Sequence, residues 1–180
     1  MTVLSEQRLN GECPRIRKVK AAKSRALDGF VDTMQEAYEY ADAKGVELWM
    51  ENLCNYQKFH PFYYIFTNIE EYLYVIDVLD KPKVIFDVCH ETVGGGDPIQ
   101  VFSQIKDYVA AFSFSDTMGD RDSHSPLGKG VIDYPQLLNE IDKAGWQGVV
   151  AFETHGVDPR ANLKFLNQLI DGGEYLTQTA

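Results

Sequence analysis

The sequence predicts an α/β protein with a parallel sheet, on three observations. Short apolar runs rich in β-branched and aromatic residues alternate along the chain with segments of helical periodicity. None of these runs alternates strictly between apolar and polar residues, which is typical of strands buried on both faces. Cap signals open the helical segments, and strands that alternate with helices are joined by right-handed crossovers. We therefore expect one helix followed by four strand–helix units.

The elements follow one another in a regular order. The expected strands cover residues 46–50, 83–86, 108–114 and 148–152, and the expected helices cover 19–44, 69–79, 98–106, 133–145 and 158–172. Thr67, with Glu70 three residues later, reads as a capping box for the second helix. Asp97, Asp133 and Asp158, each with a proline close behind, read as the N-caps of the last three.

Length and composition limit the class of protein. The chain has 180 residues, 44% of them hydrophobic and 24% charged, which predicts a single soluble domain with a sizeable core. We expect that domain to cover residues 19–180, after a loose N-terminal extension over residues 1–18. The formal net charge of −10 argues against a nucleic-acid partner, and the absence of an apolar run of about 18 residues argues against a membrane span.

Three cysteines, Cys13, Cys54 and Cys89, are odd in number and widely spaced. Such usage does not suggest a disulfide framework, and residues 1–17 contain no secretory apolar segment. We therefore expect a cytoplasmic protein. Cys54 and Cys89 lack the pattern of a catalytic nucleophile and are expected to be small buried thiols. The glycine run 94–96 is expected to be a flexible loop rather than a phosphate cradle.

A carboxylate follows each expected strand, and function gathers at this end of parallel sheets. The four acids are Glu51, Asp87, Asp116 and Glu153. They could cap the following helices, but each helix already has its own cap further along the chain. Converging carboxylates without a counter-charge repel one another, and a divalent cation relieves that cost. The sequence therefore favours a metal site over a structural role.

The histidines support the same hypothesis. All four fall in the expected strand-to-helix loops: His60, His90, His124 and His155. His90 stands three residues after Asp87, and His124 stands two after Asp122, so carboxylate and imidazole ligands are paired twice. Mixed sets of this kind suit Zn²⁺, Mn²⁺, Co²⁺ or Fe²⁺ better than Ca²⁺. His60, in an aromatic stretch, is expected either to pack or to line a substrate.

Four segments together resemble one known family. They are residues 46–52, 86–90, 115–133 and 148–153, in this order. The set resembles the xylose isomerase-like TIM-barrel superfamily, which contains sugar isomerases and epimerases and the endonuclease IV type (AP endonuclease family 2). The resemblance covers roughly residues 25–171 and corresponds to the second half of those proteins. It implies a parallel (βα)4 half of a TIM barrel.

The resemblance also implies roles for individual residues. The family's metal ligands, a Glu, an Asp, a His and a Glu, match Glu51, Asp87, Ser113 and Glu153, so Ser113 stands where the family has its histidine. Asp122 and His124 match the pair that endonuclease IV uses for an additional zinc, and His90 matches a histidine that contacts substrate or a second metal. We thus expect metal ligands at Glu51, Asp87, His90, Asp122, His124 and Glu153, and substrate contacts at His90, Arg121 and His155.

The function implied is a sugar isomerase or epimerase that depends on a divalent ion (Mn, Zn, Co or Mg). Glu51 and Glu153 would be the catalytic pair that moves a proton beside the carbonyl of a small sugar or polyol. Two alternatives stay open: a non-catalytic half-barrel subunit, favoured by Ser113, and an endonuclease IV-like repair enzyme, favoured by Asp122 and His124.

Length itself predicts a partner. A barrel of this family usually needs about 250 residues. A half-barrel of 180 residues would leave two sheet edges open, which favours association. We expect a homodimer or pairing with a second half-barrel chain.

Overall fold

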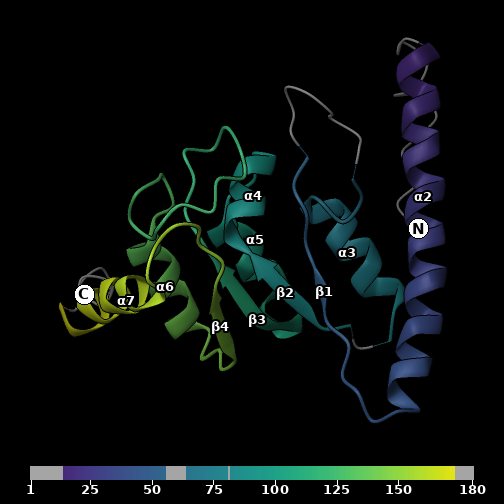
Figure 1. Cartoon of the computed structure of the whole chain (residues 1–180). Coiled ribbons are helices and arrows are strands. Elements are labelled where there is room, and N and C mark those ends of the chain that lie inside the picture. The colour runs from purple at the N-terminus through teal and green to yellow at the C-terminus, as the bar shows by residue number, and fades with distance from the viewer. Residues whose placement is uncertain (1–13, 56–63, 81, 173–180) are drawn as a thin grey trace.

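The computed structural model describes residues 14–55, 64–80 and 82–172. Helices and strands alternate in the expected order, and a short helix that was not expected follows the second strand (Figure 1). The elements are α2 (Pro14–Asp42), β1 (Met50–Glu51), α3 (Ile69–Val78), β2 (Val84–Asp87), α4 (Val88–Gly94), α5 (Pro98–Ile105), the 3₁₀ turn η1 (Lys106–Tyr108), β3 (Val109–Phe114), α6 (Tyr134–Lys143), β4 (Val149–Phe152) and α7 (Pro159–Gly172).

The four strands form one parallel sheet in the order β1-β2-β3-β4. Asp87 at the end of β2 is in register with Ser113 of β3, and Ser113 is in register with Ala151 of β4. A parallel sheet whose strands follow sequence order is what a succession of right-handed crossovers in one direction produces. The predicted α/β fold with a parallel sheet is confirmed.

Aromatic side chains fill the core between the sheet and its helices. Phe112 of β3 lies at the centre, with ring centroids 5.9 Å from Phe86, 5.1 Å from Phe102 and 4.8 Å from Trp146. The Trp146 indole N–H donates to the Val109 carbonyl at 2.7 Å, so its polar end is satisfied as the ring packs. These contacts anchor β3 in the core.

The helix α2 packs against α3, at the end of the sheet where β1 lies (Figure 1). It runs from Pro14 to Asp42, so it begins five residues before the expected start. Val31 is buried in the core, and Lys23 forms an ion pair with Glu71 of α3. The Lys83 N–H, just before β2, donates to the Tyr38 hydroxyl at 3.3 Å.

The N-caps of α5 and α6 are the aspartates that the sequence predicts. Asp97 accepts from the Ile99 and Gln100 N–H groups at the start of α5, and Asp133 accepts from the Gln136 N–H at the start of α6. The capping box was misplaced by one residue. Asn68, not Thr67, is the N-cap of α3, and Thr67 instead donates its N–H to the Glu71 carboxylate.

The two outer strands differ from expectation. The strand expected over residues 46–50 is reduced to Met50 and Glu51, and Val46 is exposed. The prediction that the strands are buried on both faces is confirmed for β2 and β3. It is wrong for β4, where Val149 and Val150 are 57% and 37% exposed. Both outer strands lack a further neighbour within the described part of the chain. The sheet thus ends in two open edges.

The described helices contain no segment long and apolar enough to cross a membrane.

Candidate functional site

Asn52 joins the ends of β1 and β2, although sequence reasoning gave it no role. Its buried side chain accepts the Asp87 N–H at 2.7 Å and donates to the Asp87 carbonyl at 3.0 Å. This carboxamide continues the pairing where the two-residue strand β1 stops. It therefore holds Glu51 and Asp87 side by side. The signal that could have revealed it is an amide directly after a strand-end carboxylate, at a position that proves fully buried.

Asp87 uses its two oxygens differently. Oδ1 accepts the His90 N–H at 2.6 Å and caps α4, so the capping role that we had weighed against is correct for this oxygen. Oδ2 is buried and has no hydrogen-bond partner in the described part of the chain. Burial raises the pKa of Asp87, while the charge and N–H of His90 and the nearby Ser113 hydroxyl work in the opposite direction. One oxygen is thus structural, and the other is a buried polar atom for which the described residues supply no hydrogen bond.

Glu51 and Glu153 come from opposite ends of the sheet. Glu51 closes β1, and Glu153 directly follows β4, with its N–H bonded to the Phe114 carbonyl at 3.1 Å. Burial and the negative charges of Asp87 and Glu153 raise the pKa of Glu51. Because that charge interaction reaches across β2 and β3, the three carboxylates form one electrostatic group.

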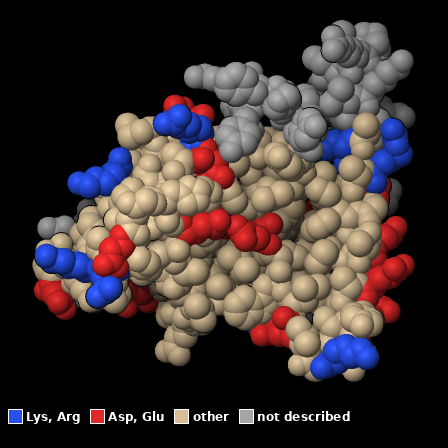
Figure 2. Space-filling model, viewed as in Figure 1, with Lys and Arg blue, Asp and Glu red and all other residues tan. Residues whose placement is uncertain are grey.

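Acidic side chains run across the middle of the face shown in Figure 2, and the Lys and Arg side chains visible there lie toward its periphery. An acidic centre of this kind attracts a cation and not a phosphate.

Ser113 lies inside this group, at the position where the resemblance expects a histidine. It is buried on β3, and its hydroxyl donates to Glu153 Oε2 at 3.0 Å. A serine offers no imidazole nitrogen to a metal. It orients the Glu153 carboxylate instead.

His90, Asp122 and His124 form a second set beside the carboxylates. Asp122 Oδ2 lies 3.2 Å from His90 Nε2 and 3.2 Å from His124 Nε2. Burial would lower the pKa of His90, but the bond to Asp122 and the charges of Asp87 and Asp122 outweigh it and raise that pKa to about 9. Burial would raise the pKa of Asp122, but His90 and His124 hold it below its usual value.

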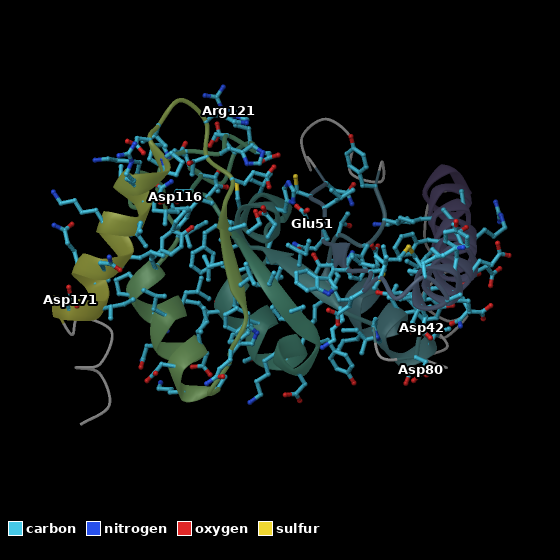
Figure 3. The ribbon with its side chains drawn as sticks, turned by 60° about the horizontal axis from the view of Figure 1, so that its bottom comes forward. Asp42, Glu51, Asp80, Asp116, Arg121 and Asp171 are labelled. Carbon is cyan, nitrogen blue, oxygen red and sulfur yellow. The ribbon has the colours of Figure 1, made fainter. Side chains whose placement is uncertain are left out.

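The remaining predicted residues lie in different settings. His155 is exposed at the rim, where its ring packs on that of His124 at 4.7 Å between centroids. Arg121 is exposed, and Figure 3 shows it at the outer end of its loop, away from Glu51. Asp116 shapes this loop, since its Oδ1 accepts the N–H groups of Thr117 and Ile132. His60 lies outside the described residues.

Two groups of described residues could hold a metal ion. One consists of Glu51, Asp87 and His90, and the other of Cys54, His90 and Asp122. In each group the ligand atoms all lie within 4.8 Å of one another. Four of the six predicted ligands, Glu51, Asp87, His90 and Asp122, therefore lie in these groups, whereas His124 and Glu153 lie in neither. Cys54 is a member that sequence reasoning did not assign.

A parallel sheet in sequence order, with carboxylates and imidazoles gathered at its carboxyl edge, defines an α/β-barrel type of protein with a candidate metal site at its mouth. The chain belongs to the xylose isomerase-like TIM barrel family, whose model matches residues 6–169.

Similar proteins include several epimerases. Fructoselysine 3-epimerase of Escherichia coli O157:H7 is 23% identical over 124 residues, which cover 68% of this chain and 43% of the epimerase. An uncharacterized protein of Methanocaldococcus jannaschii is 22% identical over 139 residues, which cover 74% of this chain and 45% of that protein.

Several solved structures have the same fold as this chain. A D-tagatose 3-epimerase-like protein superposes with a TM-score of 0.71 at 22% identity, covering 86% of this chain and 57% of that protein. An L-ribulose 3-epimerase gives 0.65 at 15% identity, covering 83% and 56%. At such identities the likeness shows the fold alone. The chain spans about half the length of these relatives.

Proposed function

We propose that the chain supplies the metal-binding half of a sugar isomerase or epimerase that transfers a proton beside a carbonyl. The observation that carries the proposal is the Asp87 Oδ2 atom, buried without a partner between carboxylates from both ends of the sheet. The epimerases among the similar proteins support the reaction class.

The donor set fits a divalent ion. Glu51, Asp87 and Glu153 would hold it, and an ion placed among them would relieve both their mutual repulsion and the unpartnered oxygen. These three ligands are all oxygens, because Ser113 stands in place of an imidazole and His90, which lies in one group with Glu51 and Asp87, has its Nδ1 against the Asn52 carbonyl. An all-oxygen set suits Mn²⁺ or Mg²⁺ better than Zn²⁺ or Co²⁺. When bound, the ion would polarise the carbonyl and hydroxyl oxygens of the substrate.

Glu51 and Glu153 would carry the proton. One carboxylate takes the proton from the carbon beside the carbonyl, the C–H electron pair moves onto the carbonyl as an enediolate, and the other carboxylic acid returns a proton. Ser113 fixes Oε2 of Glu153, which leaves Oε1 to face the substrate.

Substrate contacts would come from the rim. His155 is exposed beside the site and is our first candidate, with Arg121 a second that its loop would have to bring inward. His90 is less suited, because its two nitrogens already contact Asn52 and Asp122. The ligand that fits this polar, acidic mouth is a small sugar or polyol.

A second half-barrel fits the open edges better than a second copy does. In a closed barrel one helix follows each strand. This chain has a helix before β1 as well as one after β4, so two copies closed edge to edge would bring α7 of one and α2 of the other to the same seam. A half-barrel that begins and ends with a strand has no helix outside its first or last strand, so each seam would hold one helix. We therefore propose such a unit as the partner.

Deuterium exchange tests the reaction. Incubation of the protein with Mn²⁺ and a panel of ketoses in D₂O, alone and with the missing half of a related epimerase, should place deuterium on the carbon beside the carbonyl. Glu153→Gln should reduce the exchange by about two orders of magnitude or more, and Glu36→Gln, a change at an exposed carboxylate on α2, should not. Equal exchange by Glu153→Gln and the unaltered protein would rule the mechanism out.

A repair endonuclease remains a second candidate, favoured by the contacts of Asp122 with His90 and His124. Metal-dependent cleavage of an abasic-site oligonucleotide by the same preparations would support it. The net charge of −10 stands against it.

A further inference from the structure

A small pocket lies between the start of α3, the end of α4 and the helix α5. Its volume is about 280 Å³, at the small end of the range for ligand sites, which suits a small molecule or a single side chain. None of Glu51, Asp87 and Glu153 is among the described residues that line it. The pocket is therefore separate from the candidate metal site.

Glu91 of α4 is the buried acid of this pocket. The residue is 3% exposed, and the Tyr72 hydroxyl of α3 donates to its Oε2 at 2.8 Å. Its Oε1 takes no hydrogen bond from the described residues. A side chain at position 96 would collide with Oε1, so Gly96 leaves room beside this oxygen. One oxygen of the carboxyl group is thus fixed by a tyrosine, and the other is left for a donor from a ligand.

The rest of the lining offers acceptors and a short apolar wall. Asp97 adds a second carboxylate. The amide groups of Gln100 and Gln104 already donate elsewhere, to Asp97 Oδ2 at 2.9 Å and to the Gln100 carbonyl at 3.1 Å. Ile69 and Val101 supply aliphatic side chains. The described lining residues include neither lysine nor arginine, so the two acids have no cation beside them in the pocket.

The charge of Glu91 is not balanced by the surrounding protein. Lys23 of α2 lies beside the start of α3, but its ammonium group is paired with Glu71. Burial raises the pKa of Glu91 to about 7, against the lowering effect of the Tyr72 bond and with a contribution from Asp97. A bound cation would supply the missing counter-charge and favour the ionised carboxylate.

We propose that this pocket binds the primary ammonium group of a short alkylamine or of a lysine side chain, with Glu91 as its counter-ion. An ammonium group has three N–H donors and no acceptor, which matches a lining whose charged groups only accept. The alkyl stem would lie against Ile69 and Val101. The proposal goes beyond the proposed function and does not depend on it, because the pocket shares no residue with the candidate metal site.

Calorimetric titration of the full chain with n-butylamine tests the proposal. At pH 6 the free protein holds a proton on Glu91, so binding of the ammonium group should release about one proton. Titrations in two buffers with different heats of ionisation measure that release. At pH 8.5 the carboxylate is already formed, so the release should largely disappear and the affinity should rise. n-Butanol, which has the same stem without the charge, should bind at least about tenfold more weakly.

A peptide distinguishes the two sources of the ammonium group. A capped tripeptide with lysine between two glycines carries the same butylammonium stem on a backbone. If this peptide binds with release of a proton, the pocket takes a lysine side chain of a protein partner. If butylamine binds and the peptide does not, the pocket takes a free amine. If neither binds, the proposal is wrong.

Variants locate the bound ammonium group. Glu91→Gln should lower the affinity for butylamine by about tenfold or more and remove the proton release. Glu70→Gln, the same change at an exposed position on α3, should alter neither. Glu153→Gln should also retain butylamine binding, which separates this pocket from the acidic centre of the candidate metal site and its failure from failure of the proposed function.

Three results would overturn the proposal: no binding of butylamine, equal binding of butylamine and butanol, or unchanged butylamine binding by Glu91→Gln. Since the first two come from the unaltered protein, a misfolded variant does not protect the proposal.

Discussion

At the scale of single residues, Asp87 carries two roles that can be separated. Its Oδ1 caps α4 through the His90 N–H, and its Oδ2 is the unpartnered atom at the candidate metal site. Asparagine is as good an N-cap as aspartate, so it preserves the first role and removes the charge needed for the second.

Asp87→Asn should therefore lower the affinity for Mn²⁺ by about tenfold or more. Because burial raises the pKa of Asp87, the charged carboxylate costs folding free energy, and the variant should melt at the same temperature or higher in the presence of a chelator. Calorimetric titration and thermal melts check both. Asp97→Asn, the same change at the exposed cap of α5, is the control. Unchanged Mn²⁺ affinity in Asp87→Asn would contradict the account.

Ser113 tests which metal the site prefers. Ser113→His would add an imidazole between the register partners Asp87 and Ala151, and it should raise the affinity for Co²⁺ or Zn²⁺ by about tenfold relative to Mg²⁺. Ser113→Thr keeps the hydroxyl and should leave the ratio unchanged. Competition titrations measure it, and an unaltered ratio in Ser113→His would show that position 113 does not face the ion.

At the scale of elements, α4 places both His90 and a buried acid, Glu91. The Tyr72 hydroxyl of α3 donates to Glu91 Oε2 at 2.8 Å, and Gly96 lies so close over the carboxylate that a side chain there would collide with it. The glycine run is thus the end of a helix and not the flexible loop that was expected: Gly94 ends α4, Gly95 caps it in the left-handed conformation, and Gly96 covers Glu91.

Glu91 makes stability depend on pH. Burial raises its pKa to about 7, against the lowering effect of the Tyr72 bond and with a smaller contribution from Asp97. The folded protein therefore keeps a proton that the unfolded chain loses, and stability falls as pH rises from about 4.5 to about 7.

Glu91→Gln removes this dependence. The difference in free energy of unfolding between this variant and the unaltered protein should rise in the variant's favour by on the order of 2 kcal/mol from pH 5 to pH 8. Urea unfolding at the two pH values measures the change, with Glu70→Gln, at an exposed position on α3, as the control. If the difference in unfolding free energy between Glu91→Gln and the unaltered protein is the same at both pH values, Glu91 is ionised in the folded protein throughout this range.

Elements were predictable from sequence where their signals are local. Asp97-Pro98 and Asp133 mark helix starts with their own side chains, and the structure agrees. The helix α4 escaped notice because its N-cap is Asp87, a residue already assigned to the end of a strand.

The site was predictable as a set of residues but not as a geometry. The spacing of Asp87 and His90 indicated paired ligands. The role of Asn52 and the position of Cys54 depend on contacts between segments distant in sequence, which no local pattern encodes.

At the scale of the whole molecule, the two open edges of the sheet determine how the chain is expected to associate. Val149 and Val150 are exposed on β4, and an unpaired strand with apolar side chains promotes association. The chain alone should therefore self-associate in a concentration-dependent way.

Val150→Lys should reduce that self-association by placing a charge on the edge strand. Leu163→Lys, at an exposed apolar position on α7, should reduce it less. Sedimentation velocity over a hundredfold range of protein concentration compares the self-association of the two variants. A monodisperse monomer in the unaltered protein would contradict the prediction that this edge needs a partner.

Anomalous scattering from crystals grown with Mn²⁺ would locate the ion. We expect a peak at the carboxyl edge of the sheet, in contact with the carboxylates of Glu51, Asp87 and Glu153. No peak among these three carboxylates at saturating Mn²⁺ would contradict this expectation.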